Sequence, residues 1–315
     1  MPLVDRTAET DFNLSEVAHR LEQAMAWADK GNRALASTIL DAAWEAMPAE
    51  RVRDRSFVRV LQAATLGRIG EGRDEAAARE VLAKVQFEDA PRDRAEVAFA
   101  LAQIEVGAGR FNAADDRAGD ALHWLEVAGA YARCVDVAVA LAQDYARAKQ
   151  SAYARAMAVQ GLSWARRIDD DLLLCEAVIE LARYLPRDEY ESTLEQGYEA
   201  AFRANDLWAC NAVCAEALRL WYEAGDRKAA IKWGDRTRDR AVGGLPTPES
   251  LGMPAGECFL FYARYALGRL ALGLKDERTA NALETALDAA DAAIQQEYPE
   301  WVEKLRGGLL QVRKD

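Results

Sequence analysis

Three rows of side chains recur at a spacing of 40 residues, and their chemistry suits them to bind a ligand together. Segments 95–103, 135–143 and 175–183 read AEVAFALAQ, VDVAVALAQ and CEAVIELAR. The rows are acidic at Glu96, Asp136 and Glu176, apolar at Phe99, Val139 and Ile179, and amide or guanidinium at Gln103, Gln143, Arg183, Arg219 and Arg269. Positions three, four and seven apart share a face of a helix, so the rows predict adjacent stripes along one surface.

Such stripes have the chemistry of a peptide-binding groove. Long polar side chains bond the main chain of an extended peptide, while an apolar stripe accepts its alternate side chains. The alternative is that the charges between Glu96 and Arg183 form neighbouring solvated salt bridges without a ligand. The sequence leaves both interpretations open.

Residues for catalysis or metal binding are sparse. The two histidines, His19 and His123, lie about a hundred residues apart, and nothing predicts that they meet. Cys210 and Cys214 are one helical turn apart without a second Cys or His pair, so we expect them to fill a seam between helices. The segment GRIGEG at 67–72 lacks the Lys-Ser/Thr of a phosphate loop and follows a predicted helix. We therefore expect no catalytic residue, no metal and no cofactor.

A basic stretch is the second candidate site. Three aspartates interleave with six basic residues, for a net charge of +3, at Arg227, Lys228, Lys232, Arg236, Arg238 and Arg240. The stretch could bind an anionic ligand or an acidic partner helix. The favoured alternative is a solvated outer face with pairing between residues four apart.

Composition excludes several classes of protein. The chain has 40 basic and 52 acidic residues, a net charge of −12 that argues against a nucleic-acid partner. The start, MPLVDRTAETDFNLSE, lacks the pattern of a secretory signal, and no run of roughly 18 uncharged apolar residues predicts a membrane helix. The five cysteines are odd in number and scattered, which does not indicate a disulfide framework. We expect a cytoplasmic protein with no membrane contact.

The elements that would carry these rows are helices in pairs. Helical patterns alternate with short breaks that often contain glycine, and all eight prolines fall at proposed ends or connections. Asn13 and Glu16 have the spacing of an N-terminal capping box, and a further helix is expected to start near Pro299 and to cap the end. Most of the eight tryptophans are expected in the core, with Trp301 as a capping or dimer contact. The predicted pairs span residues 14–47, 51–86, 92–127, 130–167, 170–204, 206–241 and 257–296.

The repeat resembles the tetratricopeptide repeat family. In residues 98–124, AFALAQIEVGAGRFNAADDRAGDALHW, the family's pattern is matched by Leu101, Ala102, Gly109, Phe111, Ala114 and Ala121. The first, sixth and seventh units match it through Trp27, Gly31, Ala36, Leu40, Ala43, Pro48, Trp221, Gly225, Ala230, Leu267, Gly268 and Ala280. The fourth and fifth units lack the turn glycine, and most units run to 37–41 residues instead of the family's 34, as in divergent repeats of bacterial regulators and scaffolds.

The resemblance implies an all-α protein, a right-handed α-solenoid of about seven antiparallel helix pairs with the first helices lining its concave face. The whole chain, 1–315, is expected to form one such domain, with a Gly/Pro-rich loop at 241–256 before the last repeat. We expect a non-catalytic scaffold or adaptor that binds a protein or peptide in this groove and that could dimerise through a terminal repeat. The alternatives are a ligand- or peptide-gated regulator and an all-α enzyme with an unrecognised carboxylate site.

Overall fold

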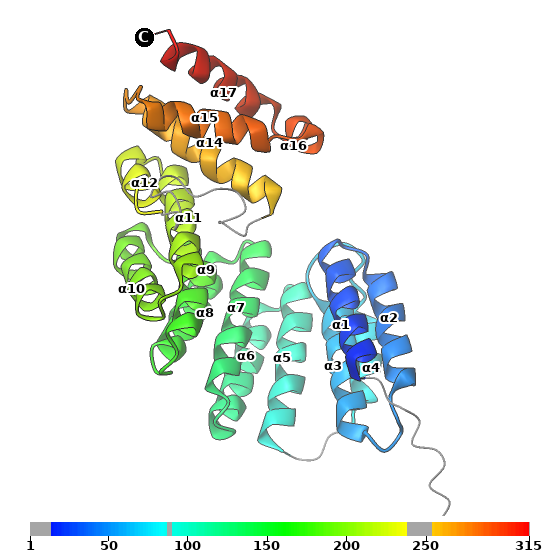
Figure 1. Ribbon diagram of the computed structural model, residues 1–315. Coiled ribbons are helices and arrows are strands. Elements are labelled where there is room, and N and C mark those ends of the chain that lie inside the picture. The colour runs from blue at the N-terminus through cyan, green and yellow to red at the C-terminus, as the bar shows by residue number, and fades with distance from the viewer. Residues whose placement is uncertain (1–13, 87–89, 238–253, 315) are drawn as a thin grey trace, which may run out of the picture. The chain divides into compact units, whose positions relative to one another are not determined.

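The chain is helical throughout the part that the computed structural model describes, residues 14–86, 90–237 and 254–314 (Figure 1). These ranges contain sixteen α-helices and no strand, and none of the helices is long and apolar enough to cross a membrane. Contacts divide the chain into two compact units, residues 1–164 and 165–315, each with its own packing. Asn13, and all of the 241–256 segment but its last three residues, lie outside the described ranges.

The first unit consists of four helix pairs. Each pair is closed by a short turn, so its two helices run antiparallel (Figure 1). The first helices of successive pairs also contact one another, α3 with α5 and α5 with α7. The helices are α1 (Leu14–Asp29), α2 (Arg33–Ala46), α3 (Val52–Gly67), α4 (Glu75–Ala83), α5 (Pro91–Gly107), α6 (Phe111–Val127), α7 (Tyr131–Arg147) and α8 (Ser151–Ala165).

The second unit continues the same alternation. Its first helices α9, α11 and α14 contact one another in turn. The α9–α10 connection contains two 3₁₀ turns, at Ala182–Tyr184 and Arg187–Glu189. The helices are α9 (Asp171–Leu181), α10 (Tyr190–Arg203), α11 (Leu207–Glu223), α12 (Arg227–Gly234), α14 (Ala255–Ala271), α15 (Glu277–Ala289), α16 (Ala292–Glu297) and α17 (Pro299–Val312).

Local signals explain where the helices begin and end. Asn32, Asp74 and Asp226 each accept a hydrogen bond from a backbone N–H of the first turn that follows. Gly109 closes α5 with φ +75°, and in the fourth pair, which lacks this glycine, Lys149 adopts the left-handed conformation with φ +58°. The prediction of paired helices is therefore confirmed, whereas a right-handed superhelix and a single domain stay predictions.

Two details of the predicted elements are wrong. The second helix of the seventh pair was expected to reach residue 296, but α15 ends at Ala289, and Asp291 caps the separate helix α16. Most tryptophans are only partly buried: Trp233 is fully buried, whereas Trp27 and Trp208 are 38% and 51% exposed. Trp301 packs against Tyr222 inside the second unit, with ring centroids 5.9 Å apart, so its observed contact is a capping one.

Candidate functional site

A cavity of about 520 Å³ opens in the first unit. Its wall comes from the end of α1, the α1–α2 turn, the start of α2, α3, the α3–α4 turn, α5 and α7. Phe99 and Gln103, from two of the repeated rows, line it, together with Leu61 and Ala140 on its apolar side. The charged side chains of its wall are Lys30, Arg33, Arg68, Glu71, Arg133 and Arg147.

Asp144 of α7 holds the polar side of this cavity in place. Its carboxylate is fully buried. Arg68 Nε donates to Asp144 Oδ1 at 2.6 Å and Arg147 Nη1 to the same oxygen at 3.2 Å, while Gln103 Nε2 donates to Oδ2 at 2.9 Å. A buried carboxylate with three such donors is well satisfied, and it fixes three lining side chains from three helix pairs.

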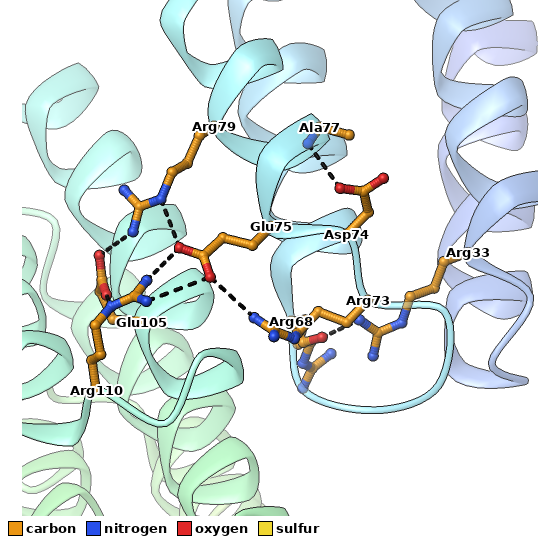
Figure 2. A network of polar contacts seen from close by, with 9 residues as sticks. All are labelled: Arg33, Arg68, Arg73, Asp74, Glu75, Ala77, Arg79, Glu105 and Arg110. Atoms are coloured by element: carbon orange, nitrogen blue, oxygen red, sulfur yellow. Dashed lines mark hydrogen bonds and ion pairs between the residues drawn. The ribbon is translucent and has the colours of Figure 1, made fainter.

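Arg33, the first residue of α2, is the most deeply buried cation of the wall, with 6% of its surface exposed. Its guanidinium donates to the carbonyl oxygen of Arg68 in the turn after α3 (Figure 2). It also donates to the carbonyl oxygen of Ile69 in the same turn. Among the described residues Arg33 forms no ion pair. Burial, followed by the nearby charge of Arg68, lowers the pKa of Arg33.

The turn after α3 is shaped to let Arg33 reach it. Gly70 adopts φ +129°, and a Cβ at this position would lie 2.7 Å from Arg33 Nη2. This turn belongs to the GRIGEG segment, whose sequence does not fit a phosphate loop. Its carbonyl groups bond a guanidinium instead, and its residues Arg68 and Glu71 line the cavity.

Arg133 joins the first two members of the acidic row. Its Nε and Nη2 donate to the two carboxylate oxygens of Glu96 at 3.0 and 2.9 Å, and its Nη1 lies 3.4 Å from Asp136. The same guanidinium lies 5.5 Å from the ring centre of Phe99. Glu96 and Asp136 are therefore paired, as the salt-bridge interpretation expects, but Glu96 is buried and not solvated. In the other rows of this unit, Val139 and Gln143 are half-buried.

In the second unit the side chains of the three rows differ in exposure and in pairing. Glu176 is exposed and Ile179 half-buried. Arg183 lies 3.2 Å from Glu216, which also pairs with Arg219 at 2.5 Å. That both units contribute to one groove stays a prediction.

Arg269, the last member of its row, has a structural role. It is 6% exposed, and its Nε donates to Thr279 at 2.9 Å while its Nη2 lies 2.5 Å from Asp276. These contacts tie α14 to the first turn of α15.

A separate network of five charged side chains joins the α3–α4 turn, α4, α5 and the α5–α6 turn (Figure 2). In the α3–α4 turn, Arg73 Nη1 lies 3.4 Å from Glu75. Glu75 accepts from Arg79 Nε at 2.9 Å and from Arg110 Nη2 at 2.5 Å, and both arginines also bond Glu105. The hydrogen bonds from Arg110, then Arg79, lower the pKa of Glu75 to about 2. Three cations and two anions are bonded to one another here, so this network has the properties of a structural cross-link.

The basic stretch is also largely paired in its described part. Lys232 of α12 lies 2.6 Å from Glu191 of α10, and Arg236, just after α12, lies 2.7 Å from Glu195 of α10. Pairing between residues four apart on one helix was expected, whereas these two ion pairs join α12 and the residues just after it to α10. Arg227 donates to the carbonyl of Tyr222, while Lys228 is exposed. Arg238 and Arg240 lie outside the described residues.

Cys210 and Cys214, which were expected to fill a seam between helices, are buried in α11. All five cysteines are free and buried, and burial raises the pKa of the Cys175 thiol to about 12. In the ranges that the structure describes, no three His, Cys, Asp or Glu side chains gather as a metal site would require.

Sequence reasoning missed Arg33, Arg68 and Arg147, which line the cavity, and Asp144, which bonds Arg68 and Arg147 from behind its wall. One signal for them was available, since Asp144 falls on the apolar stripe that Val137, Leu141 and Tyr145 define along α7. A carboxylate at such a position must find donors on neighbouring elements. The partners themselves lie up to 76 residues away in the chain, so only the fold identifies them.

Comparison with known proteins adds no family or relative to these observations. No protein-family model matches the chain, and no curated protein matches its sequence. The resemblance to tetratricopeptide repeats accordingly stays a prediction, carried by the repeated residues themselves.

Proposed function

We propose that the protein is a non-catalytic interaction scaffold that binds a polypeptide segment on the face formed by α3, α5 and α7. In this proposal the helix pairs form a tetratricopeptide-like, right-handed solenoid, and the first helices line its concave side. Repeat arrays of this kind present long surfaces to extended partners, because each pair adds one strip to the same face.

The observation that carries the proposal is the cavity beside Phe99 and Gln103. Its volume of about 520 Å³ lies in the range of ligand sites in proteins. It combines an apolar side at Leu61, Phe99 and Ala140 with guanidinium and amide groups. An extended segment can place an apolar side chain against the first and direct its main-chain carbonyl groups to the second.

The test uses a photo-reactive amino acid placed in the cavity. Benzoylphenylalanine at Thr65, which lines the cavity, should cross-link peptides that a random displayed library yields against the full chain. The control position is Thr38, an exposed residue of α2 that is not part of the cavity wall. Cross-linking at 38 as strong as at 65, or a library that yields no binder, would contradict the proposal.

A matched pair of aromatic variants adds an affinity measurement. Phe99→Ala removes the ring of the cavity wall and should weaken the selected peptides by about tenfold, the usual effect of losing one buried aromatic contact at an interface. Phe57→Ala removes an exposed ring of α3 outside the cavity and should leave the affinity unchanged. If the two variants change the peptide affinity equally, the peptide binds outside the cavity.

A further inference from the structure

The cavity wall carries more positive charge than its carboxylates balance. Lys30, Arg33, Arg68 and Arg147 contribute four positive charges, and Glu71 and Asp144 contribute two negative charges. The fifth cation, Arg133, has its own partner, Glu96. An excess of about two positive charges therefore remains, in a protein whose net charge is −12.

The guanidinium groups are arranged so that they can donate into the cavity. Asp144 occupies one nitrogen of Arg68 and one of Arg147, so in the described part of the chain the other nitrogens of both groups are available. Arg33 begins α2, and its guanidinium reaches the turn after α3, where the carbonyls of Arg68 and Ile69 hold it. Because these anchors are buried, the wall is organised before any ligand enters.

We infer that this cavity binds a phosphate-type dianion through Arg33, Arg68 and Arg147. A phosphate monoester carries about −1.5 to −2 charges at neutral pH and offers three strong acceptor oxygens, which fits both the excess charge and the number of guanidinium groups. A carboxylate would balance only half of that excess. A free phosphate ester and a phosphorylated side chain share this chemistry.

The inference deepens the proposed function and rests on it in one respect. If the bound polypeptide carries the phosphate, the cavity selects phosphorylated segments on the α3–α5–α7 face. Binding of inorganic phosphate, in contrast, tests the cavity without any polypeptide, so the two proposals can fail separately.

The first experiment measures the affinity of the full chain for inorganic phosphate, by ³¹P line broadening and thermal shift at constant ionic strength, with acetate as the comparison anion. Saturable binding of phosphate, at least tenfold tighter than that of acetate, supports the inference. Equal responses to phosphate and acetate, or no saturation, overturn it.

Three variants test whether the phosphate binds in the cavity. Arg147→Gln should weaken phosphate binding by about tenfold, the usual loss for a hydrogen bond to a charged group. Arg117→Gln is the matched control, because Arg117 is also 50% exposed and also pairs with an aspartate three residues away. Glu71→Gln removes the carboxylate of the wall and should tighten binding by about threefold, a gain that misfolding cannot produce. If all three variants bind phosphate as the wild type does, the inference is overturned.

The second experiment identifies the source of the phosphate. A peptide pool built around phosphoserine is compared with the same pool built around serine. Tighter binding of the phosphorylated pool, strengthened further by Glu71→Gln, supports a phosphorylated polypeptide. If inorganic phosphate binds and the phosphorylated pool gains nothing, a free phosphate ester is supported. If phosphate does not bind and the two pools bind alike, the inference is wrong while the proposed function stands.

Discussion

Asp144 is the single residue on which the arrangement of the cavity wall most depends. Arg68, Arg147 and Gln103 all donate to its fully buried carboxylate. Asp144→Ala would leave these donors without an acceptor, and we expect the free energy of unfolding to fall by about 3 kcal/mol. Urea unfolding followed by circular dichroism measures this change.

Asp136→Ala is the control for that prediction. Asp136 lies on the same helix, but its side chain is 56% exposed and its pairing with Arg133 is long, at 3.4 Å. Exposed pairs contribute about 0–1 kcal/mol, so the loss should be at most one third of that for Asp144→Ala. Similar losses for the two variants would show that the buried carboxylate has no special role.

Glu75 predicts a pH dependence of stability at acidic pH. Its pKa is lowered to about 2 by the hydrogen bonds from Arg110 and Arg79, whereas a glutamate in the unfolded chain titrates near 4.3. A lowered folded-state pKa means that the stabilisation is complete above the unfolded value and is lost as pH falls through the folded value. The melting temperature of wild type should therefore exceed that of Glu75→Gln at pH 6, with the difference vanishing as pH approaches 2.

The arginine partner provides a second check on Glu75. Arg110→Gln removes the larger of the two causes of the shift, so the same acid-dependent difference should be much smaller in that background. If the difference in melting temperature between wild type and Glu75→Gln stays constant from pH 6 to pH 2, the lowered pKa of Glu75 is contradicted.

At the scale of elements, α3 and α5 approach each other at two glycines 40 residues apart. A Cβ at Gly107 would lie 2.2 Å from the carbonyl oxygen of Gly67, and a Cβ at Gly67 would lie 2.3 Å from Ile104. Gly107→Ala must push the two helices apart, and we expect it to lower the free energy of unfolding by about 2 kcal/mol, as overpacking does. Chemical unfolding of the full chain tests this.

Gly119→Ala is the matched control within a neighbouring helix. Gly119 lies inside α6, and a Cβ there would meet no atom within 4 Å. Alanine costs less backbone entropy than glycine in a helix, so this variant should be more stable than wild type by about 0.5 kcal/mol. If both glycine variants lose stability equally, close helix approach is not the reason for Gly107.

The elements could be predicted from the sequence because their ends depend on local residues. Asn32 and Asp226 cap helices, Gly109 closes one, and Pro299 begins the last, each through contacts within a few residues. The sequence did not predict the end of α15, where the apolar pattern runs on although Asp291 starts a new helix.

The cavity was predictable only in part, and for a different reason. Phe99 and Gln103 were found because their rows repeat at 40 residues, which is visible without the fold. Arg33, Arg68 and Asp144 form no repeat, and the segments that bring them together are 35 to 76 residues apart. Their association follows from the fold, which brings the start of α2, the turn after α3 and the end of α7 together, and a periodic pattern does not encode this.

At the scale of the whole molecule, the described contacts connect each helix mainly to its neighbours along the chain. Two clusters of buried apolar residues each lie within one unit, one around Leu40 and Val58 and one around Tyr262 and Leu283. In the proposed solenoid, the free energy of unfolding would be close to a sum of terms for single repeats and for neighbouring repeats. A local loss of stability should therefore stay local.

Hydrogen exchange of the full chain tests this property and, with it, the proposed solenoid. Asp144→Ala removes the acceptor shared by α3, α5 and α7, so amide exchange should accelerate in these helices and stay unchanged in α14 and α17. Arg269→Gln, which frees Thr279 and Asp276, should give the opposite distribution, with faster exchange in α14 and α15 alone. Exchange that accelerates uniformly in either variant would indicate one cooperative core, because only a closed globule transmits the loss to every helix at once.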